Sequence, residues 1–362
     1  MRIAFGLVGI GLGGGVMTSE APFVFEIKHS ENVTARVFEF GRRGYGDNSN
    51  VARFFGLLMD LFRFTILLAT SKPDLIHLNS AYFRPALLRD PAYVAISRIF
   101  GVRVFIKYHG SDVDLLVGKS LLWKVLGRFC VKSAAGIGVL SSEEKLNFKI
   151  AGHPMDKIRQ VKNVVNCQKF EGAERALRTD GQLLVISRFI PGKGVIESIE
   201  AMAMITVAAP QVTLVCVGDG PDRRQAENRV RDLNLDKKVV FTGRVSEEAA
   251  TEFYLNSSAL VFPTYFNEGF PMTLFQAVAA GLPIITTRIR AAADYLHEPE
   301  NCLWVTPRSA HDLAERVLYL LANPCLMHSM SNNNRELAQR FSPKRIVPEY
   351  LDIYEQLINQ TN

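Results

Sequence analysis

The sequence is poor in cysteine and has no pair of cysteines in C-x-x-C spacing. Its five cysteines are scattered and odd in number, which excludes a disulfide framework like that of small secreted domains. This pattern predicts a reducing compartment, the cytoplasm. The apolar amino terminus runs into a glycine cluster at residues 9–15 without a cleavage-site pattern, so we expect a first β-strand there and no secretion signal.

Long apolar runs without charges are also lacking. Residues 51–68 come closest, but they include Arg53, Asp60 and Arg63, and ionised side chains are costly inside a membrane. The segment therefore predicts a buried helix of a globular domain and not a membrane span. Low-complexity tracts and short-period repeats are absent as well.

Acidic residues are scarce in one half of the chain only. Residues 1–178 carry 25 Lys and Arg against 15 Asp and Glu, a balance of +10, whereas residues 179–362 carry 17 against 21, a balance of −4, and together they give the net charge of +6. Halves of opposite sign indicate different partners. We expect no nucleic acid, because the basic residues are dispersed and lack stacking or zinc motifs. An anionic membrane or a phosphorylated acceptor fits the basic half.

Two α/β domains are predicted from the length of 362 residues and from short apolar runs that alternate with helical patterns. We expect an N-terminal domain at 1–166 and a C-terminal domain at 179–344, with the helix at 345–362 returning to the first. The predicted strands are 2–8, 33–40, 74–78, 103–108, 136–140 and 158–162, then 182–186, 213–217, 239–242, 259–262, 283–286 and 302–305. Each set predicts a doubly wound sheet, with ligands at the carboxyl ends of the strands.

The most informative motif begins at Glu268 and reads E-G-F-P-M-T-L-F-Q-A-V-A-A-G-L-P-I-I. It predicts a loop, then a helix over 271–280 that ends at Gly281. The free N–H groups of a helix N-terminus attract phosphate, and the carboxylate of Glu268 accepts hydrogen bonds from hydroxyl groups. Phosphate and hydroxyls together indicate a nucleotide-sugar.

A second phosphate site is predicted at the start of the C-terminal domain. Arg188 and Lys193 lie on a glycine-rich turn between a strand and a helix, where two cations can clamp a diphosphate without a metal. The alternative is a solvated surface turn. Later strands end in Gly218-Asp-Gly220 and in Gly243-Arg244, and glycines at such ends let a ribose or base approach the backbone, although they also simply make turns.

Together these motifs resemble the donor half of retaining glycosyltransferases of family 4, most clearly over 182–286. The resemblance implies the GT-B fold, two Rossmann-like domains facing across a cleft, and no cofactor beyond the nucleotide-diphosphate sugar. It implies that Glu268 binds donor-sugar hydroxyls and that Arg188 and Lys193 bind the diphosphate. The remaining donor-binding residues would be Gly218, Gly220, Arg244, Gly269, Phe270, Met272 and Thr273. The family's second glutamate falls on Gln276, which keeps an acceptor oxygen but has no charge, so ribose binding is expected to weaken by about 1 kcal/mol.

In the first half, His109-Gly110 follows a predicted strand and is similar to the family's His-Gly element beside the transferred sugar, although a lone histidine is more often structural. Asp112-Val-Asp114 matches the metal-binding D-x-D of other glycosyltransferases, but three residues match easily by chance and the two cations offer the charge that a metal would supply. We therefore predict no metal.

The glycines after the first strand fit G-x-G-x-x-G and raise the alternative of a dinucleotide-binding dehydrogenase. The acidic residue expected at the end of the second strand is poorly placed, since Glu39 comes too late. In the family, this turn brings bare backbone to the diphosphate and acceptor, which assigns that role to Gly13, Gly14 and Gly15.

The segment from Leu115 to Lys132 predicts a basic amphipathic helix, with Lys124 and Arg128 opposite Leu122 and Phe129. Such a helix can lie on an anionic membrane, and the alternative is an ordinary surface helix packed on the core.

The prediction as a whole is a retaining, metal-independent glycosyltransferase that uses a UDP- or GDP-sugar and a lipid-linked or envelope-polysaccharide acceptor, peripheral at the inner face of the membrane. A nucleotide-sugar epimerase of the same architecture and a non-catalytic binding protein are the alternatives. The sequence leaves open the sugar, the base, the acceptor and the oligomeric state.

Overall fold

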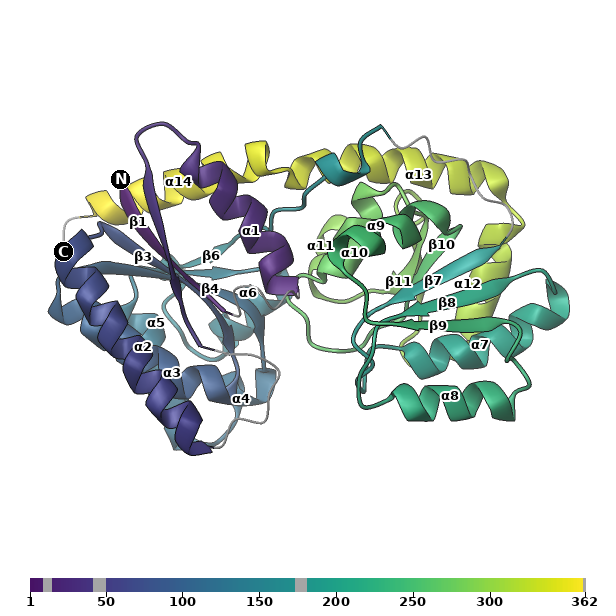
Figure 1. The fold of residues 1–362 in the computed structure, drawn as a ribbon, viewed down its shortest axis with the longest axis horizontal. Helices are drawn as coiled ribbons and strands as arrows, with labels where there is room; N and C mark the ends of the chain where they lie inside the picture. The colour runs from purple at the N-terminus through teal and green to yellow at the C-terminus, as the bar shows by residue number, and fades with distance from the viewer. Residues whose placement is uncertain (9–14, 42–49, 173–180, 361–362) are drawn as a thin grey trace. The chain divides into compact units, whose positions relative to one another are not determined.

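The computed structural model describes residues 1–8, 15–41, 50–172 and 181–360. The chain divides into two compact units. The first contains Met1–Val164, Asn267–Phe270 and Pro343–Asn362, and the second contains Val165–Phe266 and Pro271–Ser342. Each unit is built on one six-stranded sheet with helices packed around it (Figure 1).

The sheet of the first unit has the order β2-β1-β3-β4-β5-β6, and every pairing is parallel. Buried strands alternate with helices along the chain, as expected when both faces of a sheet are covered. The elements are β1 (Arg2–Leu7), α1 (Gly15–Lys28), β2 (Thr34–Glu39), α2 (Asn50–Ser71), β3 (Leu75–Tyr82), α3 (Arg84–Ile99), β4 (Arg103–Ser111), α4 (Val113–Val117), α5 (Leu121–Ser133), β5 (Gly136–Val139), α6 (Ser142–Ile150), η1 (Met155–Lys157), β6 (Ile158–Gln160) and, near the end of the chain, α14 (Pro343–Asn359).

The sheet of the second unit has the order β12-β11-β10-β7-β8-β9, also parallel. Because the strand order reverses between β7 and β10, the loops that follow these two strands flank the switch point, where such sheets bind ligands. The elements are η2 (Gln168–Phe170), β7 (Gln182–Ile186), α7 (Val195–Ala208), β8 (Thr213–Val217), α8 (Arg223–Asp232), β9 (Val239–Gly243), α9 (Glu247–Asn256), β10 (Ala259–Phe262), α10 (Met272–Ala279), β11 (Ile284–Thr287), α11 (Arg290–Tyr295), β12 (Leu303–Val305), α12 (Ala310–Leu321), α13 (Pro324–Ala338) and η3 (Gln339–Phe341).

Strands β3 and β4 extend beyond their predicted ends at residues 78 and 108. They pair with each other through Ser80 opposite Tyr108 and, after a register shift, Tyr82 opposite Ser111. His109 consequently lies within β4, whereas the sequence had predicted that it follows the strand. Strand ends of this kind depend on the neighbouring strand, which local sequence does not reveal.

The segment 115–132 is not one helix, contrary to the prediction. It spans the end of α4 and most of α5, and Gly118 lies between them. A Cβ atom on Gly118 would lie 1.9 Å from the carbonyl oxygen of Asp114, so only glycine allows the chain to leave α4 this tightly. Upstream, Asp112 Oδ1 accepts a hydrogen bond from the Asp114 backbone N–H at 2.9 Å, and the D-x-D pattern therefore caps a helix.

Helix α2 is only partly buried, although the sequence predicted a buried helix over 51–68. Its Asp60, Phe64 and Leu68 are buried. A stripe of large apolar side chains with the spacing of a single helix face is exposed: Phe55, Leu58, Met59, Phe62 and Ile66. The segment has apolar residues on more than one face, and only one of these faces is buried.

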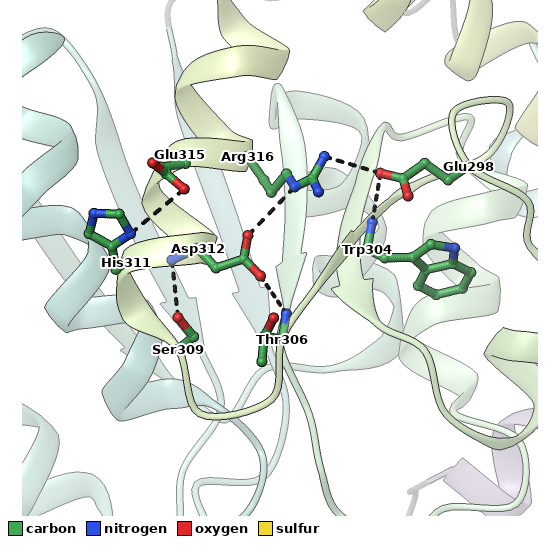
Figure 2. Close-up of polar contacts among 8 residues, drawn as sticks. All are labelled: Glu298, Trp304, Thr306, Ser309, His311, Asp312, Glu315 and Arg316. Carbon is green, nitrogen blue, oxygen red and sulfur yellow. Dashed lines mark hydrogen bonds and ion pairs between the residues drawn. The ribbon is translucent and has the colours of Figure 1, made fainter.

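Helix ends in the second unit follow the sequence signals. Gly281 follows the C-cap residue of α10 and has a φ of +64°. Its N–H donates to the carbonyl of Val278 at 2.9 Å, which confirms the predicted end of the helix at this glycine. Helix α12 starts at a polar network (Figure 2), in which Ser309 Oγ accepts from the Asp312 N–H and Asp312 Oδ2 accepts from the Thr306 N–H at 2.7 Å. Arg316 lies 3.6 Å from Asp312 and 3.4 Å from Glu298, which links this cap to the preceding loop.

The last helix, α14, packs against α1 in the first unit (Figure 1). Its Tyr350 and Tyr354 rings meet Phe5, Phe23 and Phe105 with centroids 4.7 to 6.5 Å apart, edge to face.

In the described parts of the chain, no helix combines the length and the apolar run needed to cross a membrane. All five cysteines are free thiols, as the sequence predicted: Cys130, Cys167, Cys216, Cys302 and Cys325.

Candidate active site

The loops on the two sides of the switch point in the second unit bind each other. The turn after β7 contributes Gly192, whose carbonyl accepts the N–H of Tyr265 at 2.8 Å and the hydroxyl of Thr264 at 3.1 Å. Gly194 is the N-cap residue of α7 with φ of +79°, and a Cβ atom there would lie 2.7 Å from the carbonyl oxygen of Pro263. These contacts fix the turn that carries Arg188 and Lys193.

Lys193 is buried in this turn, with only 4% of its surface exposed. Its Nζ lies 5.1 Å from the ring of Phe266 and 5.7 Å from that of Phe262, distances at which an aromatic face attracts a cation. Burial, followed by the charge of Arg188, lowers the pKa of Lys193 to about 7. Arg188 itself is exposed. An anion bound here would favour the protonated form of Lys193.

The other residues predicted to bind the donor are placed as follows. A Cβ atom on Gly218 would lie 1.9 Å from the carbonyl oxygen of Ser187, and one on Gly220 would lie 2.3 Å from that of Phe189. Both glycines are therefore required by the packing of their turn on the turn after β7. Arg244 is exposed after β9, and Gln276 is buried on α10, close to buried Met272 and half-buried Thr273 in the same helix. Gly13 and Gly14 lie outside the described residues, and Gly15 begins α1.

The Glu268 loop belongs to the first unit by its contacts. A Cβ atom on Gly269 would lie 3.0 Å from the carbonyl oxygen of His109 and 2.8 Å from Glu144 Oε2. One on Gly110 would lie 3.4 Å from the carbonyl of Asn267. Glu268 is half-buried and Phe270 is buried. Two motifs more than 150 residues apart, His109-Gly110 and Glu268-Gly269, are thus in backbone contact.

His109 is held by buried polar side chains that the sequence analysis did not identify. Its Nε2 lies 2.8 Å from Asn79 Oδ1 and 3.7 Å from Glu20 Oε1. Lys107 donates to Glu20 Oε1 at 2.7 Å, and both partners of this ion pair are buried. Two acceptors beside Nε2 place the ring proton on that nitrogen, so Nδ1 is an acceptor.

The charge state of His109 follows from its surroundings. Burial, with smaller contributions from Lys107 and His77, holds the pKa of His109 well below its usual range. The imidazole is therefore neutral near pH 7, and it can accept one hydrogen bond from a hydroxyl group through Nδ1. Buried atoms Glu20 Oε2 and Asn79 Nδ2 have no partner among the described residues, which adds hydrogen-bonding capacity to this edge of the sheet.

A signal for the buried network was present in the sequence. In the apolar strands β3 and β4, polar residues recur at alternate positions, His77 with Asn79 and Lys107 with His109, and therefore share one face of the sheet. Glu20 had no such signal, since its partner Lys107 is 87 residues away. Among the described residues, no group of three or more His, Cys, Asp or Glu is placed to hold a metal ion.

Residues 168–337, which comprise most of the second unit together with the Asn267–Phe270 loop of the first, match the model of the family described as Glycosyl transferases group 1. This segment belongs to that family.

Relatives extend the comparison beyond the group 1 domain. The capsular polysaccharide biosynthesis glycosyltransferase CapM of Staphylococcus aureus is 22% identical over 361 residues, covering 93% of this chain and 88% of that protein. An exopolysaccharide phosphotransferase of Streptomyces coelicolor is 27% identical over 187 residues, covering 51% of this chain but 20% of that protein. With several other relatives, the match also covers only about half of their length.

Solved structures agree with the fold. The crystal structure of Anabaena HepE in complex with UDP and glucose superimposes with a TM-score of 0.76 at 17% identity, covering 98% of this chain and 99% of that one. The fold is GT-B, as predicted from the sequence.

Replacing Lys107 with Met should lower the free energy of unfolding by about 3–5 kcal/mol, because it leaves the carboxylate of Glu20 buried without its partner. Urea denaturation followed by circular dichroism measures the effect. The double variant Lys107→Met, Glu20→Gln should recover part of the loss, since it removes the orphan charge.

The matched control is Lys162→Met, which breaks the more exposed pair with Glu349 at 2.8 Å. It should cost less than about 1 kcal/mol. If Lys107→Met lowered the free energy of unfolding no more than this control does, the buried pair would not be a major contributor to stability.

Proposed function

We propose that the protein is a retaining, metal-independent glycosyltransferase that transfers a sugar from a nucleoside diphosphate to a hydroxyl group of an acceptor. The observation that carries the proposal is the buried cation Lys193, next to Arg188 and at the switch point of a group 1 domain. A cation with a pKa near 7 in an apolar environment gains more from a diphosphate than a solvated lysine does.

In the proposed reaction, the bond between the anomeric carbon and the diphosphate breaks, and a new bond to the acceptor oxygen forms on the same face of the sugar. The acceptor proton passes to the leaving diphosphate, so no protein nucleophile is needed. Arg188 and Lys193 stabilise the negative charge that develops on the diphosphate. Glu268 and the Nδ1 atom of His109 accept hydrogen bonds from sugar hydroxyls and so orient the donor.

UDP is the preferred nucleotide of the proposal, because HepE, which shares the fold, was solved with UDP and glucose; GDP is the alternative. A lipid-linked or envelope-polysaccharide acceptor is supported by the names of relatives, which include CapM and a Campylobacter jejuni transferase that acts on a diphospho-undecaprenol. The site would be on the cytoplasmic side, where nucleotide-sugars are made.

Gln276 favours one rival function, a binding protein without turnover, because it lacks the charge of the family's glutamate.

Arg188→Ala should lower turnover by about 100- to 1,000-fold, the usual effect of removing one group that stabilises transition-state charge. The release of UDP or GDP from a panel of their sugars, with the acceptor present, measures turnover. Arg231→Ala, at an exposed position on α8, is the control and should leave the rate unchanged. Near-normal turnover in Arg188→Ala would contradict the diphosphate clamp.

The same assay tests the remaining parts of the proposal. Turnover should be unaffected by EDTA, and activity that requires an added divalent ion would refute metal independence. Nuclear magnetic resonance of the product should show the donor's anomeric configuration, and inversion would refute the retaining reaction. Binding of the donor without release of nucleoside diphosphate would identify the non-catalytic alternative, and isomerised donor without acceptor would identify an epimerase.

The affinity for UDP should fall as the pH rises above 7, since the free protein loses the Lys193 proton through a pKa of about 7 and the diphosphate binds the protonated form. The loss approaches about tenfold per pH unit between about pH 7.5 and 9, where UDP is itself fully ionised. Calorimetry in two buffers of different ionisation enthalpy should detect proton uptake. Lys193→Arg, which stays charged, should abolish the trend, and a flat profile in the native protein would contradict this role.

We also propose that the first unit associates peripherally with an anionic membrane. Helix α5 exposes Leu121 (74%) and Val125 (55%) beside the basic residues Lys124 and Arg128. The apolar stripe on α2 adds exposed surface in the same unit. Apolar side chains flanked by cations are typical of elements that lie in a membrane interface.

Vesicles of phosphatidylcholine and phosphatidylglycerol should sediment the protein at low salt, whereas phosphatidylcholine alone should not. The variant Leu121→Ser, Val125→Ser should reduce the bound fraction several-fold, because about 1–2 kcal/mol of apolar burial is lost for each side chain. Val207→Ser, Val240→Ser changes two exposed valines of the second unit and should have no effect. Equal binding of both variants would refute the assignment to α5.

A further inference from the structure

The first unit contains a cavity of about 380 Å³ that none of the proposed transfer chemistry uses. Helix α4 contributes Val117, α5 contributes Lys124 and Arg128, and Ile150 and His153 come from the end of α6 and the turn that follows. Two of the lining residues are cations and none is acidic. The volume is at the lower end of the range for small-molecule sites.

His153 is the reason to regard this cavity as a binding site. Only 7% of the residue is exposed. Its Nδ1 atom is buried and has no hydrogen-bond partner among the described residues. The ring is fixed by packing against Phe148, with centroids 5.3 Å apart. His153 lines the cavity, and a buried polar atom that lacks a protein partner is normally satisfied by a ligand or by water.

The charges around His153 favour an anion. Lys124 and Arg128 are one helical turn apart on α5, and neither forms an ion pair in the described parts of the chain. Burial, followed by the charges of Arg128 and Lys132, lowers the pKa of His153 to about 4. The imidazole is therefore neutral at pH 7, and it can donate a hydrogen bond from Nδ1 to an anion that the two cations hold.

The surroundings of the cavity indicate what carries the anion. Ile150 is 65% exposed and Val117 is exposed at the cavity, and Leu121 follows them at the start of α5. A soluble anion gains nothing from these side chains. The headgroup phosphate of a lipid places hydrocarbon next to its charge and matches both the cations and the apolar rim.

We propose that this cavity binds the phosphate group of an anionic lipid, between Lys124, Arg128 and the Nδ1 atom of His153. The inference rests on the membrane association proposed above and adds to it a defined headgroup site. It assigns no role in sugar transfer to these residues.

Vesicles of phosphatidylcholine with about 20 mol% phosphatidic acid test the site, because they present an exposed phosphate monoester. Lys124→Gln, Arg128→Gln should weaken vesicle binding by about tenfold or more. The control Lys119→Gln, Lys149→Gln removes the same charge from exposed positions that do not line the cavity and should weaken binding no more than about threefold. Equal losses in the two variants would overturn the proposal in favour of diffuse attraction.

A second measurement keeps the proposal separate from membrane binding and catalysis. Dihexanoyl phosphatidic acid, which is soluble, should raise the pKa of His153 in the nuclear magnetic resonance titration of the full chain, since a bound anion stabilises the imidazolium. Inorganic phosphate should do so only at concentrations about tenfold higher or more, because it lacks the acyl chains. No change in the pKa, or equal potency of the two probes, would refute a lipid site whether or not UDP binds and sugar transfer occurs.

Discussion

The buried ion pair between Lys107 and Glu20 is the constraint around which the edge of the first sheet is organised. It joins β4 to α1 at 2.7 Å in a place without solvent, and such a pair is tolerated only when both charges are compensated. Because Glu20 also lies near His109, the pair orients the imidazole that Asn79 holds from β3. Three elements thus converge on one side chain, and the Glu268 loop reaches the backbone of that same residue.

The two units bind charge by different means. In the second unit, Lys193 is positioned by two loops that hydrogen-bond to each other at the switch point, and its neighbours are aromatic. In the first unit, the buried charges of Lys107 and Glu20 are paired with each other, whereas Lys124 and Arg128 line a cavity next to exposed apolar surface. The family match covers most of the second unit and, of the first, only the Asn267–Phe270 loop. The net charge also differs along the sequence, with a balance of +10 in residues 1–178 and of −4 in residues 179–362.

Much of the fold could be predicted because buried parallel strands are continuous apolar runs: β7, β8 and β10 lie at the predicted residues. The features that could not be predicted depend on contacts between residues that are far apart in the sequence. The ends of β3 and β4 depend on each other, and Glu20 resembles a solvated helix residue until its distant partner is known. In the candidate site, the motif residues were found from local patterns, whereas their buried supports were not.

The packing of α14 on the first unit has a consequence for biosynthesis. The rings of Phe5, Phe23 and Phe105 are made before the second unit, but Tyr350 and Tyr354, which cover them, are made only after it. Nascent chains emerge amino terminus first. The second unit can therefore complete its core while the first, although most of it is made earlier, still has an uncovered aromatic face.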